Sequence, residues 1–243
     1  MRKKVAITQS NYIPWKGYFD QINQVDEVIF YDDMQYTRRD WRNRNKIKTA
    51  AGSQWLTIPV EVKGKYFQKI KDTMVSDPSW NVNHWKTISH NYARAKYFKE
   101  YREQFENLYL GVGERCLSQI NLRFISGICN ILGIKTKLSR SMDYELVEGK
   151  NQRLVDLCRK SGAAQYYSGP AARDYMDEAL FNDAGISVHY MDYSGYPEYE
   201  QSFPPFEHSV SIIDLLFNVG PDAPKYMKSF RTTDLARCEG IAT

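Results

Sequence analysis

Residues 5–49, VAITQSNYIPWKGYFDQINQVDEVIFYDDMQYTRRDWRNRNKIKT, contain the pattern that decides the fold. The stretch opens with a short apolar run, and a second apolar run, 28–31, follows after an aromatic-rich segment with helical spacing. Strand, helix and strand in this order predict a right-handed βαβ unit. Ligands of such sheets bind at the carboxyl ends of the strands. Those ends are predicted at Gln9–Tyr12 and at Asp32–Gln35.

The rest of the chain extends this alternation. Further strands are predicted at 55–60, 70–75, 136–139, 164–167 and 186–191. Helices are predicted from Pro14 to about 21, at 85–108 as one helix or a broken pair, and at 117–132, 151–160, 170–184 and 209–217. The fold class is therefore α/β, with a Rossmann-like, mostly parallel sheet flanked by helices and a helical insertion in the middle of the chain. We expect one α/β domain over residues 1–230, an insertion at about 80–133, and a loose C-terminal tail over 231–243.

The composition is that of a soluble globular protein, with 243 residues, 42% hydrophobic and 26% charged. No apolar run is long enough to span a membrane. The basic N-terminus is followed by too short and too polar a segment for a signal peptide, so we expect a cytoplasmic protein. The net charge of +4 is small and dispersed, which makes nucleic acid an unlikely partner.

The cysteines indicate neither disulfides nor a zinc site. Cys116, Cys129, Cys158 and Cys238 are far apart, and none forms a CxxC pair. Three of them fall in apolar helical patterns, where buried free thiols are expected. No metal site is predicted, and the sequence specifies no cofactor.

Two strand-to-helix turns are predicted to bind substrate. The first contains Gln9, Asn11 and Tyr12, whose polar groups could contact a base edge or a carbonyl oxygen. The second contains Ser168 and Gly169, where a helix start could donate N–H groups to an anion. An ordinary αβ turn is the alternative for the second.

A cluster of cations and amides follows the second strand. Guanidinium groups bind phosphate in a bidentate manner, and an indole offers a stacking surface. Arg38, Arg39, Asn43 and Arg44 are predicted to bind phosphate, with Trp41 as the stacking surface and Arg42 in the same arginine cluster. An exposed basic loop or strand is the alternative, and single-stranded nucleic acid could use the same residues. Nearby Asp32, Asp33 and Asp40 supply acidity that a nucleic-acid groove would avoid.

Asp32 and His84 are the candidate catalytic residues. Asp32 ends a strand at the predicted pocket, where it could bind an amine or act as a base, although turn capping is an alternative. His84 lies near a helix start among aromatic residues, and its ordinary pKa suits proton transfer at neutral pH. A structural role is the alternative for His84.

Four runs in this sequence resemble the WbqC-like protein family. They are TQSNYIPWKGYFDQI (8–22), DDMQYTRRDWRNRNKIKT (32–49), WLTIPV (55–60) and RLVDLCRKSGAAQYYSGPAARDY (153–175). The resemblance covers roughly residues 4–230, and Ser10 stands where members more often have proline. The family occurs in gene clusters for O-antigen and related surface polysaccharides. The resemblance therefore implies a transferase that places glycine on an amino sugar.

Residues 5–20 also look like the opening of HIGH-type nucleotidyltransferases such as pantothenate synthetase. In those enzymes two histidines, spaced H-x-G-H, hold ATP phosphates. Trp15 and Tyr18 occupy the corresponding places around Gly17 here. Adenylyl transfer is therefore not implied, although a nucleotide site is.

Together these observations predict a transferase that acylates, possibly with glycine, the amino group of a nucleotide-linked amino sugar. Its partners would be that sugar and an activated amino-acid or acyl donor on ATP, a carrier protein or tRNA. The sequence does not specify the oligomeric state. The predicted substrate-binding residues also include Trp15, Gly17, Tyr18 and Gln35. An ATP-dependent carboxylate-activating enzyme and a non-catalytic nucleotide-sugar-binding module are the alternatives.

Overall fold

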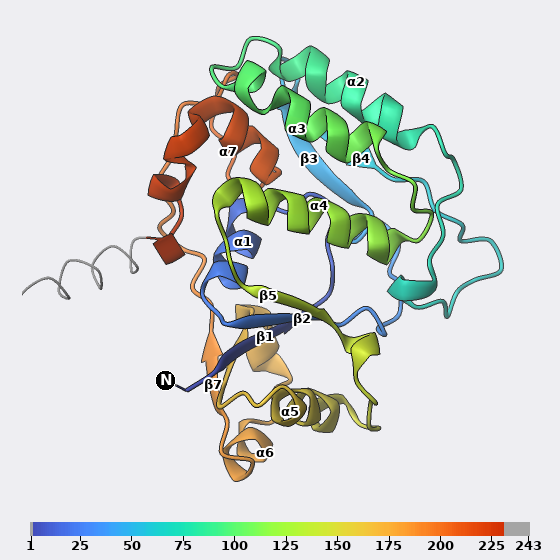
Figure 1. Ribbon diagram of the computed structural model, residues 1–243, viewed down its shortest axis with the longest axis vertical. Coiled ribbons are helices and arrows are strands. Elements are labelled where there is room, and N and C mark those ends of the chain that lie inside the picture. Colours follow the sequence, from blue (N-terminus) through green and yellow to red (C-terminus); the bar gives the residue numbers. More distant parts are fainter. Residues whose placement is uncertain (1, 231–243) are drawn as a thin grey trace, which may run out of the picture.

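A computed structural model describes residues 2–230 of the chain (Figure 1). Its strands are Lys4–Thr8 (β1), Glu27–Phe30 (β2), Arg44–Thr49 (β3), Gly52–Thr57 (β4), Lys137–Arg140 (β5), Gln165–Ser168 (β6) and Ser187–Tyr190 (β7). Its α-helices are Lys16–Asn23 (α1), Trp80–Tyr92 (α2), Phe98–Leu110 (α3), Leu117–Leu132 (α4), Lys150–Lys160 (α5), Glu178–Asp183 (α6) and Ile212–Val219 (α7). Short 3-10 helices are Ile70–Asp72 (η1), Ser141–Asp143 (η2), Pro170–Asp174 (η3) and Gly220–Tyr226 (η4).

Five strands form a parallel sheet in the order β5-β2-β1-β6-β7. The chain moves to one side of β1 to form β2 and β5, and to the other side to form β6 and β7. The gap between the carboxyl ends of β1 and β6 is therefore the switch point of the sheet, where open α/β folds bind their ligands. The predicted α/β class with a mostly parallel sheet is confirmed.

Both faces of this sheet are covered, which explains why the central strands β1 and β2 contain continuous apolar runs. Alternate residues point to opposite faces. Ala6 and Val28 join a large core with α1, α4 and α7, whereas Val5 and Ile29 join a smaller core with α5 and α6. Figure 1 shows α1 and α4 above the sheet and α5 and α6 below it.

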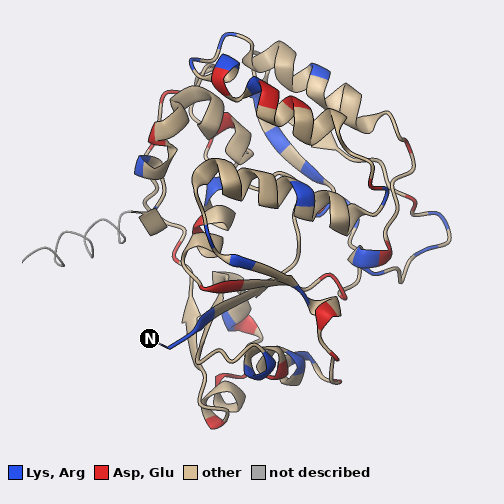
Figure 2. Cartoon of the chain, viewed as in Figure 1, with Lys and Arg blue, Asp and Glu red and all other residues tan. Residues whose placement is uncertain are grey.

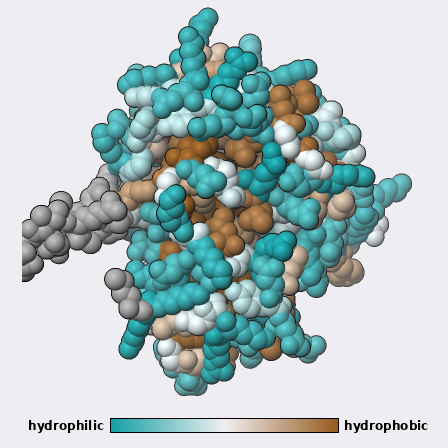
Figure 3. All heavy atoms as spheres, in the orientation of Figure 1, coloured by the Kyte–Doolittle hydropathy of each residue, from teal (hydrophilic) through white to brown (hydrophobic). Residues whose placement is uncertain are grey.

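A second layer of structure precedes β5 in the chain. The antiparallel hairpin β3–β4 lies beside α2 and α3, and α4 follows them before the chain returns to the parallel sheet (Figure 1). Ile47 and Leu56 of the hairpin are buried in the large core, so this layer packs on the sheet through shared apolar residues. In Figure 3 a band of apolar residues crosses the middle of this face, over α4, and hydrophilic residues cover most of the rest.

Several predicted boundaries are corrected. The segment 70–75 is not a strand: η1 occupies its start, and Val75 makes an isolated bridge to Val60. The helix predicted at 170–184 is broken, because Asp177 accepts a hydrogen bond from the Leu180 amide and caps a new helix, α6. Part of the basic run after Asp40 forms β3. For the segment 85–108 the predicted alternative of a broken pair of helices is confirmed, as α2 and α3.

Two further points concern the C-terminal tail and membrane spans. The tail predicted at 231–243 lies outside the described residues. Within residues 2–230, no helix has the length and apolar character needed to cross a membrane.

Candidate functional site

A large cavity opens at the switch point between β1 and β6 and has a volume of about 780 Å³. Its wall combines the ends of β1 and β6 with the first turns of α1, η3 and α5. The lining residues are Ile7, Thr8, Gln9, Asn11, Trp15, Tyr18, Gln21, Tyr31, Met34, Trp41, Arg42, Gly149, Lys150, Arg153, Leu154, Tyr166, Ser168, Gly169, Pro170, Ala171, Ala172, Tyr175 and Tyr193. A cavity of this size, with apolar walls and a few polar groups, is the usual form of a small-molecule site.

The charged residues of this lining are all cations, namely Arg42, Lys150 and Arg153, and the lining contains no aspartate or glutamate. Lys150 occupies the first turn of α5, with its ammonium 3.7 Å from the centroid of the Tyr175 ring. Arg153 donates hydrogen bonds to the Tyr31 hydroxyl and to a backbone carbonyl, both at 2.8 Å. The positive end of the α5 dipole adds to these charges. The charge on the cavity lining is therefore positive.

Aromatic rings form much of the remaining wall. The Trp15 and Tyr193 rings meet edge to face at 5.3 Å, and Tyr18 donates a hydrogen bond of 2.9 Å to the Gln9 carbonyl. Burial raises the pKa of Tyr193 to about 12, so its hydroxyl stays protonated at neutral pH. A Cβ on Gly17 would lie 2.3 Å from the Trp15 ring, so glycine here allows the indole to fold back over α1.

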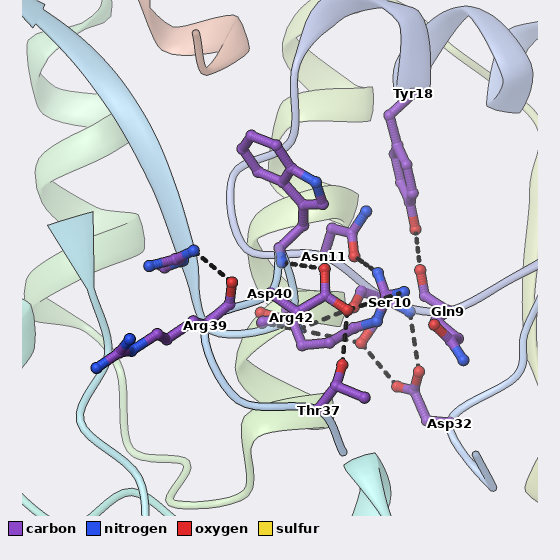
Figure 4. Close-up of polar contacts among 12 residues, drawn as sticks. Gln9, Ser10, Asn11, Tyr18, Asp32, Thr37, Arg39, Asp40 and Arg42 are labelled. Atoms are coloured by element: carbon purple, nitrogen blue, oxygen red, sulfur yellow. Dashed lines mark hydrogen bonds and ion pairs between the residues drawn. The ribbon is translucent and has the colours of Figure 1, made fainter. Parts of the chain in front are cut away.

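The turn between β1 and α1 is braced from below by Asp32 (Figure 4). The fully buried Asp32 carboxylate accepts hydrogen bonds from the Ser10 amide at 2.8 Å, from the Ser10 hydroxyl at 2.7 Å and from the Ser118 hydroxyl. Asn121 adds a bond of 3.1 Å to the Ser10 hydroxyl. The structure thus places Asp32 outside the cavity lining, with its oxygens occupied by the protein.

The same turn is also held by the segment predicted to bind phosphate. The Tyr12 amide donates to the Trp41 carbonyl at 3.0 Å, and the Asn45 amide group donates to the carbonyls of Tyr12 and Ile13 at 3.1 and 3.0 Å. These bonds fix Ile13 at a φ of 36°, a conformation that a β-branched residue rarely adopts. Asn43 is buried and donates to the Ile58 carbonyl at 2.8 Å.

The predicted arginines do not converge on the cavity. Arg42, a member of the predicted arginine cluster that was not itself assigned to the site, lines the cavity and donates to the Asn11 side chain (Figure 4). Arg44 instead stacks 4.1 Å from the centroid of the Trp55 ring and donates to the Arg39 carbonyl. Arg38 is exposed and donates to the Val62 carbonyl at 3.2 Å, on a different surface.

His84 lies in a buried aromatic cluster away from the cavity lining. Its Nε2 is 3.2 Å from the Thr57 carbonyl, which only accepts, so Nε2 carries the proton. Its Nδ1 then accepts from the Tyr12 hydroxyl at 2.9 Å, and Tyr12 contacts the Tyr109 hydroxyl at 2.8 Å. Burial lowers the pKa of His84 to about 4, so the imidazole is neutral at physiological pH.

The cavity brings together about half of the predicted site residues. Gln9, Asn11, Trp15, Tyr18, Trp41, Ser168 and Gly169 line it. Tyr12 and Gly17 lie behind the wall, and Gln35 is exposed and donates to the Tyr66 carbonyl at 2.9 Å.

Lys150 and Arg153 were missed. The available signal was two cations three residues apart in the first turn of a predicted helix that follows a strand.

No group of three or more metal-ligating side chains occurs among residues 2–230.

The fold and cavity together define an α/β protein with a cation-lined cavity at the switch point of a parallel sheet. The model of the WbqC-like protein family matches residues 9–226, and the chain belongs to this family. The chain is 52% identical over 229 residues to the uncharacterized protein Rv1507c of Mycobacterium tuberculosis. The aligned region covers 94% of this chain and 99% of the relative. No solved structure gives a significant match.

Proposed function

We propose that this protein is a cytoplasmic transferase that acylates the amino group of a nucleotide-linked amino sugar. The observation that carries the proposal is that every charged residue lining the switch-point cavity is a cation. A diphosphate linking a nucleoside to a sugar carries the complementary charge, and arginine and lysine groups are the residues that bind it. The family resemblance, which points to surface polysaccharide assembly, supports sugar chemistry.

The rest of the lining suits the other parts of such a ligand. Trp15, Tyr175 and Tyr193 offer aromatic faces on which a base or sugar ring can stack. Gly169 and the following Pro170–Ala172 turn present little side-chain bulk, so the ligand could approach the backbone closely. The volume of about 780 Å³ falls within the usual range for small-molecule pockets.

The cations also support a route for acyl transfer. Positive charge nearby lowers the pKa of a bound ammonium group, which favours the neutral, nucleophilic amine. The amine nitrogen attacks the acyl carbonyl carbon, a C–N bond forms, and the bond to the leaving group breaks with its electron pair. The proton lost by the nitrogen passes to the leaving group or to water. Arg42 and Arg153, which line the cavity, would stabilise the developing oxyanion.

The catalytic roles predicted for His84 and Asp32 stay predictions, and this route does not use them. Their polar atoms are occupied by protein partners, as described above. The donor is an activated acyl or aminoacyl group, and glycine is the first group to test because of the family resemblance.

A non-catalytic nucleotide-sugar-binding module is the second candidate. One observation favours it: the cavity lining contains no histidine, aspartate or glutamate that could act as a base. The same lack of carboxylates gives no support to the nucleotidyltransferase alternative, whose magnesium ions need oxygen ligands.

Mass spectrometry tests the proposal. The purified protein is incubated with UDP- and dTDP-linked amino sugars and, in turn, with glycyl-tRNA, acyl thioesters, or glycine with ATP. We expect a mass gain on the sugar with one donor class, and little gain with the Lys150→Gln variant. Sugar binding without a mass gain for any pair would favour the binding module. If the protein shows no sugar binding and no mass gain, both the transferase and the binding module are refuted.

A further inference from the structure

The loop between β4 and η1 exposes two neighbouring aromatic rings. Tyr66 and Phe67 are 74% and 81% exposed, which makes them the most exposed large apolar side chains among the described residues. Figure 1 shows this loop projecting from the edge of the molecule, to the right of α4. Exposing so much apolar area has no benefit for an isolated fold, so it indicates an interaction surface.

The base of this loop is firmly held. The Tyr36 amide donates to the Gln68 carbonyl at 2.9 Å, and the Gln35 side chain donates to the Tyr66 carbonyl at the same distance. Gln68 donates across the loop to the Glu61 carbonyl at 2.7 Å. The backbone is thus fixed while the two rings point outward.

Cations surround the rings. Lys63, Lys65 and Lys69 are exposed within the loop, and Figure 2 shows blue Lys or Arg segments on the projecting loop. Arg38 is tied to the loop through the Val62 carbonyl at 3.2 Å, and Arg115 lies 3.9 Å from Glu61. Glu61 is the one acidic residue between residues 60 and 70, and it is paired with Lys65 at 2.5 Å.

We propose that this loop docks the protein on an anionic membrane surface. Tyr66 and Phe67 enter the boundary between headgroups and acyl chains, where aromatic rings are favoured, and the lysines contact anionic headgroups. The geometry favours lipid over single-stranded nucleic acid. The two rings are 4.9 Å apart and perpendicular, at 90°, so they cannot stack successive parallel bases. They also form a projecting tip rather than a groove.

The loop lies on the same edge of the molecule as the cavity. Its end is bonded to the segment that follows β2, through a hydrogen bond of 2.9 Å from the Ile70 amide to the Met34 carbonyl. Met34 lines the cavity. Docking would therefore hold the cavity near the bilayer. The inference goes beyond the proposed function and does not depend on the reaction.

Vesicle flotation tests the inference on the full chain. The wild type and the Tyr66→Ser/Phe67→Ser double variant are mixed with vesicles of phosphatidylcholine alone or with phosphatidylglycerol. The Leu110→Ser variant is the matched control, because Leu110 is also exposed, at 47%, but lies on α3. Thermal unfolding checks that all three proteins are folded.

We expect the wild type and the control to float with phosphatidylglycerol vesicles and less with phosphatidylcholine alone. The double variant should bind roughly tenfold more weakly, because two aromatic rings lose their burial, and salt should weaken binding. Equal binding of the double variant would overturn the proposal. Binding of single-stranded RNA without vesicle binding would also overturn it. Self-association through this loop without vesicle binding would do the same.

Discussion

The residues that line the cavity and those that brace the turn between β1 and α1 are neighbours in sequence, but their polar groups point in different directions. Ser10, Asp32 and Asn45 direct their polar groups into the protein, where backbone and side chains bind them. Asn11 and Arg42 line the cavity wall beside them. A dense run of polar residues can therefore serve as much to hold a strained turn as to bind a ligand.

Removing the Asp32 carboxylate, which holds the turn between β1 and α1, should have the largest effect on stability. Asp32→Ala leaves the Ser10 amide and the hydroxyls of Ser10 and Ser118 without their acceptor in a buried site. We expect a loss of about 3 kcal/mol or more in the free energy of unfolding, measured with urea. Asp183→Ala, at an exposed position of α6, should change it by less than about 0.5 kcal/mol. If both variants lose a similar amount of unfolding free energy, Asp32 stabilises the protein no more than an exposed aspartate does.

The buried His84 should make part of the stability depend on pH. Its pKa is lowered to about 4 in the folded protein, below the ordinary value of 6.5, so between these values the unfolded state binds a proton that the native state does not. The stability that His84 contributes is therefore complete above pH 6.5 and falls by about 3 kcal/mol as the pH approaches 4.

Asp214 works in the opposite direction, because burial raises its pKa to about 7, so its contribution grows as the pH falls below that value. The wild type should for this reason be compared with His84→Gln, which keeps Asp214. Urea unfolding at several pH values should show the difference in stability between the two proteins shrinking on acidification. A difference that is constant from pH 7.5 to 4 would contradict the neutral, buried imidazole.

The sequence predicted the sheet well because β1 and β2 contain short apolar runs and segments with helical periodicity separate the strands. It also predicted that Gln9, Trp15 and Ser168 lie together, because they follow from where strands end and helices start, and these residues line the cavity. The break after η3 and the hairpin strand β3 were missed, because Asp177 was not recognised as a cap and the charges of 42–48 masked a strand with one buried face.

The roles of individual polar residues could not be predicted in the same way. Whether Arg44 contacts a ligand or stacks on Trp55 depends on the register of the β3–β4 hairpin, which pairs residues of two strands and has no local signal. Lys150 and Arg153 reach the cavity only because α5 follows β5 and returns beneath the sheet. Such contacts depend on tertiary structure.

The central claim is that the switch-point cavity binds an anionic ligand through cations at the start of α5. Calorimetric titration with a UDP-linked amino sugar tests it most directly in the wild type, Lys150→Gln and Lys160→Gln. Lys160 is the matched control, because it lies at the other end of α5 and pairs with Asp156 at 2.8 Å. We expect Lys150→Gln to weaken binding about tenfold and Lys160→Gln to leave it unchanged. No binding by the wild type, or equal affinities for all three proteins, would contradict the claim.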